Sequence, residues 1–201
     1  MVGVIDYDAG NVKSVMKAVE RLGAEPILTA DTAVLDKCTS LILPGVGSFG
    51  KAIENLKERG LDKYIKKAVS EDGKLLLGIC LGMQLLFEKS YEYGCHEGLG
   101  LIPGEVRPLA DDISLKVPHM GWNSLEFKAE SPIFKYVREG EYVYYVHSFY
   151  AKNCEKYTTA VSEYGVPVTG AVQCGRVFGT QFHPEKSGKA GLNILRAFCE
   201  E

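Results

Sequence analysis

A cysteine lies between two glycines at the end of an apolar run, an arrangement that suits a nucleophile. Residues 75–79 (Leu-Leu-Leu-Gly-Ile) are followed by Cys80, Leu81 and Gly82. Gly-x-Cys-x-Gly matches the strand–turn–helix elbow that exposes a nucleophile at the carboxyl end of a sheet. The helix that begins there favours the thiolate, and the Leu81 N–H can donate to an oxyanion. The alternative is a buried thiol, with the glycines serving only close packing of helix and strand.

A cysteine nucleophile needs a general base, and His183 is the best candidate among the four histidines. It ends the apolar strand predicted over Val177–Phe182 and is followed by Pro184 and Glu185. Proline holds the preceding residue extended, and residues two apart in an extended chain project to the same side. Glu185 can then accept the ring N–H and leave the other nitrogen free for Cys80, as in a catalytic triad. The alternative is a capping histidine beside a solvent-facing glutamate.

A glycine-rich loop at residues 44–52 (Pro-Gly-Val-Gly-Ser-Phe-Gly-Lys-Ala) fits two phosphate-binding templates incompletely. A P-loop needs Ser or Thr after the lysine to bind Mg²⁺, and this loop has Ala52 there. A dinucleotide-binding loop needs an acidic residue at the end of a second strand, and the acid at that spacing, Asp72, ends a predicted helix instead. Two interpretations of the loop remain open: it could bind another negatively charged group, or it could be a turn without a ligand. The His-x-Glu pair lacks the cysteine pair that zinc deaminases need downstream, so we predict no metal and no cofactor.

Alternating apolar runs and amphipathic stretches indicate the elements that position these groups. Strands are expected at Val2–Ile5, Leu41–Leu43, Leu75–Ile79, Val106, Leu115–Val117, Tyr142–Val146, Thr158–Ser162, Val168–Val172 and Val177–Phe182. Helices are expected over residues 12–22, around 53–56, over 61–69, over 83–87 and over 188–201. Apolar strands alternating with helices predict an α/β fold, a three-layer αβα sandwich around a mostly parallel central sheet, with a β-rich second half.

Length and composition exclude several classes of protein. The 201 residues carry a formal charge of −3, which fits one domain over 1–201 and argues against nucleic acid or membrane partners. The first residues reach Asp6 without a basic segment, and the longest apolar run, 75–83, is about half of a membrane span. The six cysteines are irregularly spaced, so we expect free thiols and a cytoplasmic protein.

Taken together, these motifs resemble those of the class I (triad) glutamine amidotransferases, through residues 78–84 and 182–185. A narrower resemblance, to glutaminase subunits of imidazole glycerol phosphate synthase, rests on residues 6–11, 43–50, 118–123, 145–148 and 181–187. The segment 118–123 (Pro-His-Met-Gly-Trp-Asn) is the most specific of them. Two positions depart from the family pattern: Asp8 stands where glycine is usual, and Phe149 often has a tyrosine counterpart.

This resemblance implies a glutaminase with a Cys-His-Glu triad. Cys80 would attack the side-chain amide of glutamine, with His183 as acid and base and Glu185 orienting it. A thioester would form, ammonia would leave, and water would release glutamate. The oxyanion would be held by backbone N–H groups of Val46 or Gly47 and Leu81, and the amino-acid end of glutamine by Gln84, Glu92, Ser148 and Phe149.

The resemblance also implies a partner, a (β/α)₈ cyclase subunit that forms a heterodimer with this chain. It would use the ammonia to make imidazole glycerol phosphate in histidine biosynthesis. The residues that would face it are Asn11, Met120, Trp122, Asn123 and Lys186. An exposed Trp122 beside Met120 suits the core of a protein interface, although core packing is the alternative.

Three other functions stay open at this point. The chain could supply ammonia to a different synthase, such as that of pyridoxal phosphate synthesis. It could be a regulatory module that binds glutamine without hydrolysing it. It could also bind a nucleotide through residues 45–51, which Ala52 argues against.

Overall fold

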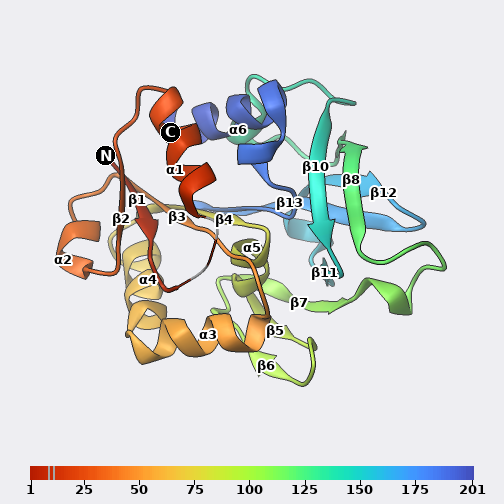
Figure 1. Ribbon diagram of the computed structural model, residues 1–201, viewed down its shortest axis with the longest axis horizontal. Coiled ribbons are helices and arrows are strands. Elements are labelled where there is room, and N and C mark those ends of the chain that lie inside the picture. The colour runs from red at the N-terminus through yellow and green to blue at the C-terminus, as the bar shows by residue number, and fades with distance from the viewer. Residues whose placement is uncertain (9, 11) are drawn as a thin grey trace.

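A central eight-stranded sheet organises the fold (Figure 1). The computed structural model describes residues 1–8, 10 and 12–201. The sheet has the order β2 (Pro26–Thr29), β1 (Val2–Ile5), β3 (Ser40–Leu43), β4 (Leu75–Ile79), β14 (Val177–Thr180), β13 (Pro167–Cys174), β12 (Thr158–Glu163) and β9 (Glu126–Phe127). Strands β2 to β14 in this order are parallel, and the remaining three pair antiparallel. The carboxyl ends of β3, β4 and β14 therefore meet at one edge.

Helices cover both faces of this sheet. Helices α1 (Val12–Arg21) and α6 (Gly188–Glu200) lie on one face, and α3 (Phe49–Glu58) and α4 (Leu61–Ser70) on the other (Figure 1). The strands supply both cores because successive side chains point to opposite faces. Ile42 packs with α1 and α6, whereas Leu41 packs with α3 and α4. The predicted α/β sandwich is confirmed. Within the described residues, no helix is long and apolar enough to cross a bilayer.

Two smaller sheets make up much of the second half. One has the strand order β11 (Phe149–Lys152), β7 (Ile102–Pro108), β5 (Phe87–Ser90) and β6 (His96–Glu97). The other pairs β8 (His119–Ser124) with β10 (Tyr142–His147) in antiparallel register. Figure 1 places β8 and β10 at the opposite end of the molecule from β2 and the short helix α2 (Thr32–Leu35).

Three predicted elements are wrong in place or extent. Leu115–Val117 is a loop with an exposed Leu115, and the strand begins later, at His119. Helix α5 is Leu81–Leu85, because N–H groups of the chain at 99–102 donate to carbonyls at 85–87 and draw that segment into the smaller sheet. Strand β14 ends at Thr180 and not at Phe182.

Candidate active site

Cys80 lies at the tight connection between β4 and α5. Its φ of 54° falls in the left-handed region, which is rare for a residue with a side chain and is typical of functional turns. The N–H of Cys80 donates to the carbonyl of Thr180 at 2.7 Å, which ties the elbow to β14. A Cβ on Gly78 would lie 2.6 Å from the carbonyl oxygen of Gly82, and one on Gly82 would lie 1.8 Å from that of Leu43. The elbow predicted from the sequence is therefore present, and it requires both glycines.

His183 and Glu185 form a buried pair next to the elbow. Nδ1 of His183 lies 2.8 Å from Oε1 of Glu185, and their side chains are 3% and 2% exposed. The N–H of His183 donates to the carbonyl of Tyr144 at 2.9 Å. His183 itself is extended, as its place before proline predicts, but residues Pro184–Lys186 form a 3-10 turn, so the extended chain does not continue to Glu185. The predicted pairing is present, but the 3-10 turn brings it about, and the prediction that the chain stays extended as far as Glu185 was wrong.

The surroundings of His183 favour its protonated form. Burial lowers the pKa of the ring, but the Cys80 sulfur and the Glu185 carboxylate outweigh this effect and raise the pKa to about 9. Nε2 is buried and makes no hydrogen bond of ordinary geometry with a described residue. Cys80 and Glu185 thus interact with different nitrogens of the ring, as expected for a nucleophile and for a carboxylate that orients the base.

A cavity of about 390 Å³ opens over Cys80 and His183. Glu185 does not line it. The other residues predicted for the oxyanion and for glutamine all do: Val46, Gly47, Leu81, Gln84, Glu92, Ser148 and Phe149. The structure therefore brings together, from five separate segments, the residues that the sequence assigned to one site.

The glycine loop lies against the elbow at the rim of this cavity. The hydroxyl of buried Tyr7 donates to the carbonyl of Pro44 at 2.5 Å, and burial raises the pKa of that phenol. A Cβ on Gly45 would lie 2.7 Å from the backbone nitrogen of Gly82. The N–H groups of Val46, Gly47 and Leu81 make no hydrogen bond with another described residue. Such free donors beside a nucleophile can stabilise an oxyanion.

Gln181 is a site residue that the sequence reasoning missed. Its Oε1 accepts from Nε2 of Gln84 at 3.0 Å, and its own Nε2 lies 3.7 Å from Sγ of Cys80. Nε2 of Gln84 also donates to the carbonyl of Phe149 at 3.0 Å. The available signal was the place of Gln181 in the segment 181–187. It connects the nucleophile to the predicted glutamine-binding segment.

Glu92 lies at the cavity wall and caps a helix. Its Oε2 accepts from the N–H of Phe49 at 2.5 Å, at the start of α3. Burial raises the pKa of Glu92, while this hydrogen bond and nearby His96 act in the opposite direction. The carboxylate therefore faces both the cavity and the end of the glycine loop.

His119 and His147 form a second buried pair that the sequence did not indicate. Nδ1 of His119 lies 2.9 Å from Nε2 of His147, whose Nδ1 lies 2.8 Å from the carbonyl oxygen of Phe149. Burial lowers the pKa of His119 to about 4. Burial is also the largest cause that lowers the pKa of His147 to about 3, and the neighbouring residues His119 and His183 lower it further by smaller amounts. Both rings are therefore neutral at pH 7.

These low pKa values predict an acid-sensitive fold. Below pH 6.5 the unfolded chain takes up protons that the buried rings do not, so the free energy of unfolding falls as pH drops toward about 4. For His119 alone the loss at pH 5 is on the order of 2 kcal/mol. Urea unfolding at pH 7.5 and 5 should show that His119→Gln loses less stability on acidification than the unsubstituted chain. Equal losses would contradict the expectation.

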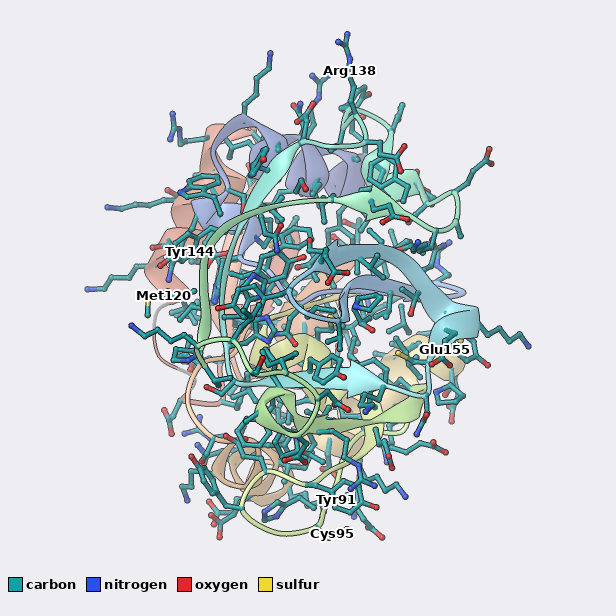
Figure 2. The ribbon with its side chains drawn as sticks, turned by 90° about the vertical axis from the view of Figure 1, so that its right-hand side faces the viewer. Tyr91, Cys95, Met120, Arg138, Tyr144 and Glu155 are labelled. Carbon is teal, nitrogen blue, oxygen red and sulfur yellow. The ribbon has the colours of Figure 1, made fainter. Side chains whose placement is uncertain are left out.

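The predicted partner residues lie in different settings. Met120 and Trp122 on β8 are 59% and 56% exposed, so Trp122 is not a core residue. Figure 2 shows Met120 and Tyr144 together at one edge of the molecule, and the Trp122 ring meets that of Tyr144 edge-on. Asn123 is half-buried behind them, and Lys186 lines the cavity. Asn11 lies outside the described residues.

Comparison with known proteins gives consistent matches. Residues 3–201 match the family model "Glutamine amidotransferase class-I". The chain is 48% identical over 200 residues to imidazole glycerol phosphate synthase subunit HisH of Listeria monocytogenes serotype 4a (strain HCC23), covering 100% of this chain and 95% of that one. It is 50% identical over 198 residues to HisH of Bacillus cereus (strain G9842), covering 98% and 93%.

Two solved structures share the fold at lower sequence identity. A crystal structure of a glutamine amidotransferase has a TM-score of 0.78 at 21% identity, covering 99% of this chain and 97% of that one. The structure of PurLQS from Thermotoga maritima has a TM-score of 0.76 at 23% identity, with the same coverage of 99% and 97%.

Proposed function

The chain belongs to the class I glutamine amidotransferase family, in its HisH branch, and we propose that it is the glutaminase subunit of an imidazole glycerol phosphate synthase. In this role residues 1–201 act as one amidotransferase domain. The observation that carries the proposal is the buried His183–Glu185 pair beside Cys80, with His183 and Cys80 both lining a cavity of about 390 Å³.

The first half of the reaction forms a thioester. His183, with its raised pKa, holds the proton that Cys80 gives up, and the thiolate attacks the amide carbon of the glutamine side chain. The resulting oxyanion accepts from the N–H of Leu81 and from that of Val46 or Gly47. His183 then passes its proton to the amide nitrogen, the C–N bond breaks, and ammonia leaves.

Thioester hydrolysis completes the cycle. His183, now neutral, removes a proton from water as the water oxygen attacks the thioester carbon. The C–S bond breaks, glutamate leaves, and the thiolate–imidazolium pair is restored. Glu185 stays ionised and keeps the Nδ1 proton of His183 in place throughout, so that Nε2 is the atom that exchanges protons.

The cavity wall fits the amino-acid end of glutamine. The carboxylate of Glu92 suits the ammonium group, and the backbone at Ser148 and Phe149 suits the carboxylate. Nε2 of Gln84 is already bonded to Phe149 and Gln181, so we expect Gln84 to hold this backbone in place.

We expect the partner to bind the surface formed by β8 and β10. Met120 and Trp122 are exposed apolar side chains there, and Lys186 lines the cavity. We expect a (β/α)₈ cyclase subunit to bind this surface as a heterodimer in the cytoplasm, and ammonia to pass to it from the cavity. A P-loop function is disfavoured because the ammonium group of Lys51 pairs with Glu54 at 2.8 Å on an exposed helix surface.

One experiment tests this function. Glutamate release from glutamine is measured with and without the purified cyclase subunit and its nucleotide ligand. We expect hydrolysis that rises when the cyclase is added. Trp122→Glu should need at least about tenfold more cyclase for the same response, because it places a charge in the interface core. Leu28→Glu, on β2 at the opposite end, is the matched control. Hydrolysis that responds only to another synthase would contradict the proposal.

A further inference from the structure

His119 and His147 lie directly opposite each other at the end of the β8–β10 ladder. Both are buried, and the ring of His147 lines the cavity that holds Cys80. The two rings meet edge to face, with centroids 5.0 Å apart. The reaction described above uses neither of them. Two buried imidazoles are costly unless their polar atoms are paired, so their hydrogen bonds need an explanation.

The hydrogen bonds of this pair can run in one direction only. The carbonyl oxygen of Phe149 is an acceptor, so Nδ1 of His147 must carry the proton. In a neutral ring, Nε2 of His147 is then an acceptor, and Nδ1 of His119 must donate to it. Nε2 of His119 is an acceptor in turn, and Nδ2 of Asn123 lies 3.3 Å from it. All four ring nitrogens are thereby paired, which fixes both tautomers.

The surroundings hold the chain of hydrogen bonds in place. His119 is stacked between the rings of Tyr145 and Tyr164, with centroids at 4.6 and 4.1 Å. Asn123 is itself fixed, because its Nδ2 donates to the carbonyl of Glu163 at 2.9 Å. The low pKa values of the two histidines agree with neutral rings.

The chain ends on the backbone that we expect to bind glutamine. The carbonyl of Phe149 accepts from two sides, from Nδ1 of His147 at 2.8 Å and from Nε2 of Gln84 at 3.0 Å. Gln84 is bonded to Gln181, which reaches Sγ of Cys80. The carbonyl of Phe149, the first residue of β11, is therefore set relative to the nucleophile, directly after Ser148 at the junction with β10.

We propose that His147, oriented by His119 and Asn123, is a positioning residue that holds the Ser148–Phe149 backbone in the place where it binds the amino-acid end of glutamine. This inference rests on the proposed glutaminase function. The residue does not touch the reacting amide. Its loss should therefore weaken the binding of glutamine more than it slows the chemical step.

Two amide substitutions at His147 separate its two hydrogen bonds. In His147→Asn the side-chain amide takes the place of Nδ1 and can still donate to Phe149. In His147→Gln it takes the place of Nε2 and keeps the contact with His119, but the donor to Phe149 is lost. Each variant keeps one buried hydrogen bond, so they are matched controls for one another and for general destabilisation.

We expect a KM for glutamine about tenfold higher in His147→Gln, with kcat changed less than KM, because a hydrogen bond to the binding backbone is lost. His147→Asn should stay within about threefold of the unsubstituted chain. Both are measured as glutamate release by the complex with the cyclase.

Alkylation of Cys80 gives an independent measurement. A diazoketone analogue that carries the amino-acid end of glutamine should react about tenfold more slowly with His147→Gln, whereas iodoacetamide, which lacks that end, should react at a similar rate with both variants. Equal KM values for the two variants would overturn the inference. So would a His147→Gln variant in which Cys80 reacts more slowly with iodoacetamide as well as with the diazoketone. Absence of glutamate release by the unsubstituted complex would instead overturn the proposed function.

Discussion

Cys80→Ala is expected to lower glutamine hydrolysis at least about 10⁴-fold, to the limit of detection. The reason is that the thioester cannot form without the sulfur, and the described cavity lining contains no second thiol. Lys186, the one amine there, lies on the predicted partner side of the cavity. The oxyanion donors remain in the variant, but they stabilise attack by water too weakly to replace a covalent route.

Glutamate release by the complex with the cyclase is the measurement for this variant. Alanine is smaller than cysteine and can be accommodated at the buried elbow, so binding to the cyclase should persist. Cys95→Ala is the matched control, because Cys95 is a free and exposed cysteine away from the cavity lining. Turnover retained by Cys80→Ala would remove Cys80 from its proposed role.

Glu185→Gln is expected to lower kcat/KM about 10³-fold or more, although the side chain has nearly the same shape. The carboxylate accepts the Nδ1 proton of His183 at 2.8 Å. An amide group that presents its NH₂ to the ring would favour the tautomer with the proton on Nε2, which cannot accept a proton from Cys80. Loss of the negative charge also lowers the pKa of His183 from its raised value.

The pH profile of Glu185→Gln distinguishes this effect from a loss of structure. The acid form of His183 should be lost at lower pH than in the unsubstituted enzyme, so the alkaline limb of the profile should move to lower pH. Glu54→Gln, at an exposed position of α3, is the control for removal of a carboxylate. Activity of Glu185→Gln within tenfold of the unsubstituted enzyme would contradict an orienting role for Glu185.

The sequence predicted the site where its signal is local. The elbow around Cys80 is one short segment, and His183 and Glu185 are two residues apart, so both were recognisable without knowledge of the fold. The position of Cys80 at the carboxyl end of the sheet followed from the elbow motif. Even here the conformation was misjudged, because the sequence did not show that a 3-10 turn, and not an extended chain, places Glu185.

Features that depend on pairing between distant segments were not predictable in this way. His119 meets His147 because of the register of β8 against β10, and that register is absent from either segment alone. The helix after Cys80 ends early because the chain at 99–102 competes for its carbonyls. Strand propensity was equally insufficient at Leu115–Val117, which pairs with no strand among the described residues.

Asp8, one of the two departures from the family resemblance, lies at a bend with positive φ. Aspartate tolerates positive φ better than most residues. Its φ is 64°, and its carboxylate pairs with Arg59, the residue directly after α3.

The contact between Gly45 and Gly82 has a consequence for the evolution of such chains. The backbone of the elbow occupies the space that a side chain on Gly45 would need, and the backbone of the loop and its strand occupies the space that a side chain on Gly82 would need. A methyl group on either glycine would therefore collide with main-chain atoms. A substitution at one position thus becomes tolerable only after the loop and the elbow have moved apart, and that same movement relaxes the other position. We expect the two sites to vary together, and to diverge from glycine first in descendants that no longer need the loop beside the cysteine.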